Sequence, residues 1–293
     1  MEWYLIAFIS ALLSALAAIA EKKALTKNNV LEFSTFVAIF SFLFSLPFLF
    51  VIDFSKITLL SFFVLFFKTI LNAVAFYSIM SALKKLDISN SLPLMDLSPG
   101  IVAVLAAVFL NEMLNIYQII GLILLILGTY LINLKQNIKF LEPFTIFVKS
   151  KAHMFILLAL LCFTITSILD KVLVGNLNIP PETFMFLQQL LTLFIFITAF
   201  IIIKKEKALS AFKVKWKNFF GLIILIGFLT VGYRYAQIVA VKEGKVALVL
   251  AIKRTSVFLA CLIGGILFKD KNLLRRIIAT VILITGGALI IIF

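Results

Sequence analysis

Apolar stretches long enough to cross a lipid bilayer recur along almost the whole of this 293-residue chain. A membrane-spanning helix needs about 20 predominantly apolar residues. Hydrophobic residues make up 63% of the sequence and charged residues 14%, whereas soluble domains contain about 45–50% and 25%. Lipid must therefore be the solvent for most of the chain, which is expected to be an all-α integral membrane protein.

Ten candidate spans fit this length, and the connections between them are short. The two longest connections, 135–151 and 204–217, are too short to fold as domains. No basic start or small-residue cleavage site indicates a signal peptide, so the first apolar run is kept as a helix. The expected spans are 3–20, 32–52, 58–82, 88–109, 115–134, 153–169, 183–203, 218–241, 246–268 and 273–293.

An internal repeat organises these spans. Shifting the chain by 158 residues aligns 72–132 with the second half without a gap, and a shift of 149 aligns the first helices. Each half holds five spans, and an odd number forces the second half to cross the membrane in the opposite direction. We expect a first five-helix repeat at 1–134, a connecting loop at 135–152 and a second repeat at 153–293. The matched pairs include Tyr77 with Tyr235, Ser98 with Ser256, Glu112 with Asp270, and Glu21-Lys22 with Asp170-Lys171.

Four of the 27 cationic residues fall inside the predicted spans, namely Lys68, Arg234, Lys253 and Arg254. A cation within the bilayer costs about 2.5–3.5 kcal/mol on insertion scales, so it usually faces protein or a wet cavity. Asp96 is expected to be the only acid well inside a span, and the 158-residue shift aligns it with Arg254. This alignment predicts an ion pair near the pseudo-twofold axis, which is either a locked structural pair or one that opens for substrate.

Polar side chains also recur on the predicted spans 3 and 8, which are repeat partners. Lys68 and Asn72 are four residues apart, and Arg234 and Gln237 are three apart, so each pair shares a helix face. Two polar faces would oppose each other across a cavity. Hydrogen bonds between helices explain the amides better than a cavity does, whereas the cations are expected to face the cavity. The predicted substrate-binding residues are Lys68, Asn72, Asp96, Arg234, Gln237, Lys253 and Arg254.

The charge of this expected site favours an anion or the carboxylate of an amino acid, because cations outnumber acids in it. A lysine neutralised by burial would weaken that preference. Neither a metal nor a cofactor is expected, since the chain has one histidine and no CxxC pair. No nucleotide-binding loop is present, which argues against ATP-driven pumping. Coupling to protons or sodium, exchange and simple facilitation stay open.

The positive-inside rule predicts the orientation. Nineteen cationic residues fall in connections on one side of the expected membrane, and four fall on the side of the termini. The cationic side should be cytoplasmic, which places both termini outside. Loops that face anionic lipid also explain most of the net charge of +14, so no nucleic-acid partner is expected.

Smaller features predict helix ends and helix contacts. Glu112 and Asp270 are expected to cap the helices that follow them. The pairs Gly264-Gly265 and Gly286-Gly287 permit close helix contact, and a homodimer through spans 5 and 10 is an alternative to a monomer. Gln188 or Gln189 is expected to bond a neighbouring helix.

The five-plus-five arrangement, with an acid just after the fourth span of each half, resembles the EamA-like branch of the drug/metabolite transporter superfamily. The sequence departs from that family at Asp270, where glutamate is usual, and at Ala251 and Val257, where proline is usual. The resemblance covers the whole chain. The stretches that carry it are 99–112, 118–121, Gly128, 253–256, 264–270 and 286–287.

This resemblance implies a transporter of small metabolites in the cell membrane, with a central cavity and alternating access. It also implies cytoplasmic termini, whereas the charge count places them outside. For the orientation we follow the charge count. The expected function is a permease or exporter of a small polar metabolite, such as an amino acid or organic anion. An integral-membrane enzyme acting on a lipid or isoprenoid phosphate is one alternative, although no paired acids suited to magnesium occur in the spans. A channel or structural membrane protein is the other.

Overall fold

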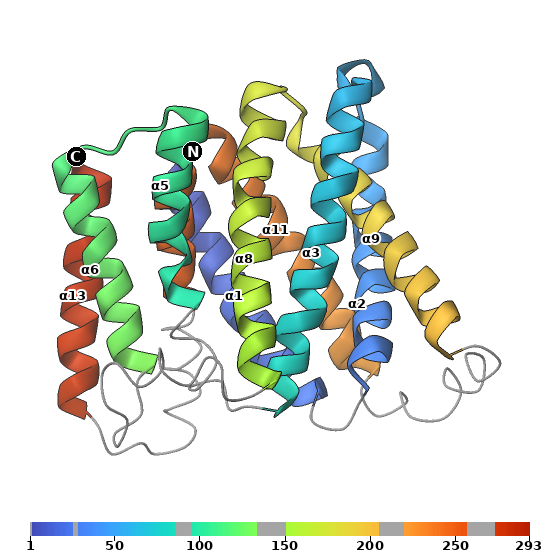
Figure 1. Cartoon of the computed structure of the whole chain (residues 1–293), viewed down its shortest axis with the longest axis horizontal. Coiled ribbons are helices and arrows are strands. Elements are labelled where there is room, and N and C mark those ends of the chain that lie inside the picture. Colours follow the sequence, from blue (N-terminus) through green and yellow to red (C-terminus); the bar gives the residue numbers. More distant parts are fainter. Residues whose placement is uncertain (1, 26–28, 86–94, 134–150, 205–219, 257–272) are drawn as a thin grey trace.

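A computed structural model of the chain describes residues 2–25, 29–85, 95–133, 151–204, 220–256 and 273–293. Within these ranges the regular structure is helical throughout, and ten α-helical segments follow the order of the ten predicted spans. The predicted all-α fold is therefore confirmed. The helices lie side by side as one bundle (Figure 1).

Six of the described helices are long and apolar enough to cross a membrane. They are α1 (Trp3–Leu25), α2 (Val30–Ser45) with the 3-10 turn η1 (Leu46–Val51), α3 (Leu59–Lys85), α8 (Lys151–Lys171) with the π turn η4 (Val172–Asn176), α9 (Pro181–Lys204) and α11 (Phe220–Glu243). The other described elements are η2 (Phe54–Lys56), η3 (Met95–Leu97), α5 (Ser98–Leu110), α6 (Ile116–Asn133), helical residues 246–256 and α13 (Leu273–Ile292).

Local sequence explains where several helices begin and end. The Asn29 side chain accepts a hydrogen bond from the Leu31 amide at 2.9 Å and so caps the start of α2. Asn111 has the left-handed φ of 54° that ends α5. Asn115 and Gln118 cap the start of α6 reciprocally, each side chain accepting from the other residue's amide at 2.8 and 3.2 Å.

Several helices run further than predicted, and two of these extensions matter for the cavity. The first helix was expected to stop at residue 20 and α8 at residue 169, but they continue to Leu25 and Lys171. This extension brings Glu21 and Asp170 inside the bundle, where they are 6% and 1% exposed. The expectation that Asp96 is the only acid within a span is therefore wrong.

The main helix contacts join helices of the first predicted repeat to helices of the second. Helix α1 packs against α11, α3 packs against α8, α2 packs against α9, and α6 packs against α13. In the predicted repeat α1 corresponds to α8, and α3 corresponds to α11. The contact of α1 with α11 and the contact of α3 with α8 are therefore equivalent, because in each of them the first helix of one repeat packs against the third helix of the other. The division of the chain at 135–152 stays a prediction.

Glycines allow the close contact between α6 and α13. A Cβ atom on Gly121 would come within 2.7 Å of the Gly286 carbonyl oxygen, and one on Gly128 would come within 2.7 Å of the Leu283 side chain. Gly286 thus serves packing within one chain. Gly264-Gly265 lie outside the described residues, and dimerisation stays a prediction.

Both termini lie at the same end of the bundle (Figure 1). Trp3 lies against Gly244, and the Asn115 side-chain amide donates to the Phe293 carbonyl at 2.8 Å. We call this the terminus end. Helices α1 and α3 finish at the opposite end with Lys22-Lys23 and Lys84-Lys85, and we call that the lysine end.

Candidate functional site

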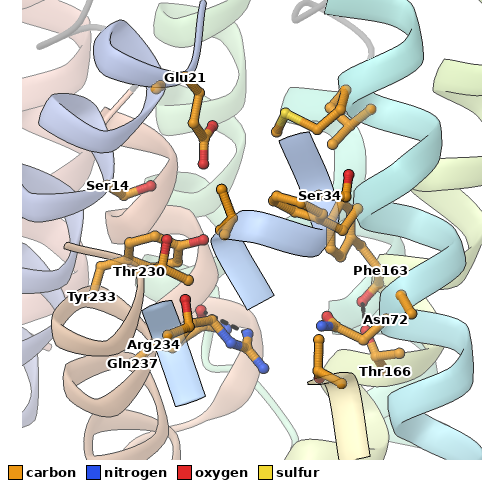
Figure 2. A pocket seen from close by; sticks show the side chains of 18 of the residues that line it. Ser14, Glu21, Ser34, Asn72, Phe163, Thr166, Thr230, Tyr233, Arg234 and Gln237 are labelled. Carbon is orange, nitrogen blue, oxygen red and sulfur yellow. Dashed lines mark hydrogen bonds between the residues drawn. The ribbon is translucent and has the colours of Figure 1, made fainter. Parts of the chain in front are cut away.

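A cavity of about 230 Å³ lies between α1, α2, α3, α8, α9, α11 and the helical residues 246–256. Its lining extends from mid-helix groups such as Arg234 on α11 toward the lysine end, where Glu21 and Leu83 line it. Figure 2 shows polar side chains from several of these helices pointing into this space.

Five of the seven predicted binding residues line the cavity: Asn72, Arg234, Gln237, Lys253 and Arg254. These residues come together because the helix packing places α3 and α11 on different sides of the same cavity. Lys68 does not line it, and the side chain of Asp96 lies outside the described residues. A role for any of these residues in substrate binding stays a prediction.

Arg234 contacts three polar side chains beside the cavity. Its Nη2 lies 3.4 Å from Asp170 Oδ2 and 3.3 Å from Gln188 Oε1, and its Nη1 donates to Gln237 Oε1 at 3.2 Å. The side chain is 11% exposed, and its Nε–H has no hydrogen-bond partner among the described residues. A buried N–H group without an acceptor is costly, so the described contacts use the hydrogen-bonding capacity of this guanidinium incompletely.

Lys68 is fully buried beside the cavity rather than facing it, which corrects the sequence expectation. Its ammonium lies 2.7 Å from Asp170 Oδ1, donates to Gln188 Oε1 at 2.7 Å, and sits 4.5 Å from the centre of the Phe184 ring. The expected contact between Gln188 and neighbouring helices is confirmed, since its oxygen accepts from α3 and α11.

Lys253 and Arg254 reach different partners from the helical segment 246–256. The Lys253 ammonium donates to Gln237 Oε1 and lies 4.8 Å from the centre of the Tyr233 ring. Arg254 donates to Ser98 Oγ from Nε at 3.1 Å and from Nη2 at 2.8 Å, which links the segment to α5. The predicted pair of Arg254 with Asp96 stays a prediction.

Glu21 and Asp170 are the site acids that sequence reasoning missed. Glu21 lines the cavity, and Figure 2 shows its carboxylate directed into the space. Each acid precedes a lysine near a helix end, which made both resemble connection residues. Their alignment under the 149-residue shift was the signal that could have found them.

The described lining carries three formal cations, Arg234, Lys253 and Arg254, and one formal anion, Glu21. The adjoining Lys68 and Asp170 pair adds no net charge. The formal balance of these groups is therefore +2, from three positive charges minus one. Such a space attracts anions and still offers a carboxylate to a ligand cation.

At the terminus end, charged side chains tie several elements together by binding main-chain groups. Lys171 donates to the carbonyls of Val241 and Gly244, both at 2.9 Å, and its ammonium lies 3.2 Å from Glu112. The other oxygen of Glu112 accepts from the Val246 amide at 2.9 Å. The prediction that Glu112 caps the following helix is wrong, because it caps the segment 246–256 of the other half.

The family of the chain follows from its sequence. The sequence profile of the EamA-like transporter family matches residues 1–134 and 150–292. The chain belongs to this family. It is therefore a multi-pass membrane transporter and not an enzyme.

One solved structure, described only as a crystal structure of a protein, superposes on the chain with a TM-score of 0.74 at 14% identity. The match covers 98% of this chain and 95% of the other, which supports the fold and carries no substrate information. A comparison with curated proteins found no significant match.

Proposed function

We propose that this EamA-like transporter carries a small anionic or zwitterionic metabolite, with Arg234 as its principal binding group. The single observation that carries the proposal is the Arg234 guanidinium, which lines the cavity and has only a long contact of 3.4 Å to the Asp170 carboxylate. Arginine can grip a carboxylate or phosphate with two parallel hydrogen bonds, and such charge-assisted bonds are the strong ones.

The surroundings of Arg234 support an anion more than a cation. Its described partners other than Asp170 are the amide oxygens of Gln188 and Gln237, which bear no charge. Lys253 and Arg254 add further positive charge to the same lining. Glu21 allows a zwitterion, because its carboxylate could receive the amino group of a ligand whose acid end is held by Arg234.

We further propose that transport proceeds by alternating access across the terminus end and the lysine end. Two features support this proposal: the contacts that tie elements together at the terminus end, and the cavity lining that extends toward the lysine end. By the positive-inside rule the lysine end is cytoplasmic and both termini lie outside. A C-terminal tag should then be accessible in intact cells, and labelling only after permeabilisation would reverse the orientation.

Flux measurements on reconstituted protein test the proposal. Proteoliposomes would be exposed to dicarboxylates, phosphates, amino acids and quaternary ammonium compounds, with the Arg234→Ala variant as the matched control. Anionic or zwitterionic compounds should enter with the wild-type protein and much more slowly with the variant. Uptake of cations alone, or equal uptake by both proteins, would contradict the proposal. Imposed proton and sodium gradients in the same vesicles test coupling.

A further inference from the structure

The buried carboxylate of Asp170 is shared unequally between two cations. Its Oδ1 lies 2.7 Å from the Lys68 ammonium, whereas its Oδ2 lies 3.4 Å from Arg234 Nη2. The side chains of Lys68 and Asp170 are 0% and 2% exposed, and that of Arg234 is 11% exposed. The shorter contact thus belongs to the lysine, which does not line the cavity, and the longer one to the arginine, which does.

Gln188 repeats this unequal sharing. Its side-chain oxygen accepts from Lys68 at 2.7 Å and from Arg234 Nη2 at 3.3 Å. Both acceptors on this side of Arg234 therefore give their short contact to Lys68. Lys68 and Arg234 thus contact opposite oxygens of the Asp170 carboxylate and share the single Gln188 oxygen, and in both cases Lys68 has the shorter contact.

From this geometry we propose that Lys68 is a positioning residue, which holds Asp170 and Gln188 so that the Arg234 guanidinium stays weakly paired and available to an anion in the cavity. The inference rests on the proposed function for the identity of the ligand. It assigns Lys68 an indirect role in place of the direct contact that the sequence suggested.

The physical reason lies in the cost of separating buried charges. If Asp170 had Arg234 as its sole cation, a ligand would have to break a buried, charge-assisted pair before it could bind. With Lys68 in place, Asp170 keeps a counter-ion when the arginine turns toward a ligand. Arg234 can then exchange one weak contact for a strong one, and no buried carboxylate is left unpaired.

The closing experiment uses the full-length protein in lipid nanodiscs. The chain has four arginines, so nitrogen-15 spectra of arginine side chains are simple, and Arg234→Lys identifies the relevant signals. Lys68→Met removes the ammonium while a flexible unbranched side chain fills its space. Lys85→Met, at an exposed position on the same helix, is the matched control.

We expect slower rotation of the Arg234 guanidinium in Lys68→Met, because Asp170 and Gln188 then close on it. Binding of succinate and inorganic phosphate should weaken by about tenfold, the lower end of the value of a charged hydrogen bond. The maximal rate of transport should change little, and Lys85→Met should match wild type in every respect. Unchanged Arg234 signals in Lys68→Met would overturn the proposal, and so would altered signals with unchanged anion affinity.

A double substitution keeps the test decisive if Lys68→Met folds poorly. Because Lys68 acts on Arg234 through Asp170 and Gln188, the Arg234 signals of Asp170→Asn should respond to Lys68→Met far less than wild-type signals do. A full-sized response without Asp170 would refute the assigned route. The spectra need no ligand, so failure of the proposed function is recognised separately, as anions that bind wild type no better than Arg234→Ala.

Discussion

The terminus end of the bundle and the cavity are held by different kinds of contact. At the terminus end, charged side chains bind the main chain: Lys171 binds carbonyls at and just beyond the end of α11, and Glu112 binds the first amide of the segment 246–256. Around the cavity, cations bind side-chain oxygens instead, as Arg234 does with Gln188 and Gln237.

The two kinds of contact suit different tasks: main-chain contacts suit closure of the terminus end, and side-chain contacts suit ligand binding in the cavity. A main-chain group is fixed by its helix, so contacts to it tie whole elements together. Side-chain acceptors can rotate and exchange partners within a fixed backbone. We therefore expect the terminus end to open as a unit when α11 and the following segment move, whereas the cavity can adapt to a ligand without helix movement.

The largest effect should come from the buried pair at the cavity wall. Asp170→Ala leaves the fully buried Lys68 without its counter-ion, and breaking a buried pair in this way costs about 3–5 kcal/mol. Denaturant unfolding in detergent should detect this loss, and adding Lys68→Met should recover most of it. A loss below about 1 kcal/mol, the range of surface pairs, would show that the cavity wall is more hydrated than its burial indicates.

Arg254→Ala should reduce transport and leave membrane insertion intact. The substitution removes two hydrogen bonds to Ser98 that join the segment 246–256 to α5, as well as one cation of the lining. We expect at least about a tenfold fall in uptake, since hydrogen bonds to charged groups contribute about 1.5–3 kcal/mol. Lys242→Ala, at an exposed position, serves as the control. Wild-type uptake by Arg254→Ala would remove this arginine from the site.

Glu112→Gln should loosen the terminus end without altering the cavity. It removes the ion pair with Lys171 and weakens the cap on the segment 246–256. A cap is worth about 1 kcal/mol, so states open at this end should rise about fivefold. Labelling of Asn72→Cys by an impermeant maleimide from the terminus side would measure this, with Cys162 and Cys261 replaced by alanine. Unchanged labelling would mean that other contacts control closure.

The smallest effect is expected at the half-buried Asp53 on the terminus end. Hydrogen bonds from Ser55 lower the pKa of this carboxyl group below its ordinary value. Its contribution to stability is therefore present above its unfolded-state pKa and is lost as the pH falls through the lower folded-state pKa. Asp53→Asn should make unfolding slightly less dependent on pH in that acidic window, as followed by thermal unfolding. An effect as large as that of Asp170→Ala would contradict the distinction between the two regions.

The sequence predicted the elements of the fold better than their ends. Hydropathy identifies where lipid must be the solvent, and that is enough to find ten helical segments in order. It cannot say where a helix stops once neighbouring helices provide partners for polar groups. Lys22 illustrates this limit: it donates to the Leu83 carbonyl at 2.6 Å and so lets α1 continue past Glu21.

The sequence predicted most of the polar residues that line the cavity, but only some of the contacts that these residues make. Helix spacing placed Asn72, Arg234 and Gln237 on polar faces, and all three line the cavity. The same spacing suggested that Lys68 faces the cavity, because periodicity cannot distinguish a wet space from a buried carboxylate. Asp170 supplies that carboxylate from α8, a helix on which the prediction had placed no charge.

Ligand-dependent stability of the purified protein tests the central claim most directly. Wild type and Arg234→Ala would be heated with a panel of carboxylates, phosphates, amino acids and quaternary ammonium compounds. A ligand at about a hundredfold excess over its Kd stabilises the folded state by about 2.7 kcal/mol. The account predicts that compounds bearing a carboxylate or phosphate stabilise wild type and not the variant. Stabilisation by neutral or cationic compounds alone, or equal stabilisation of both proteins by anions, would contradict it.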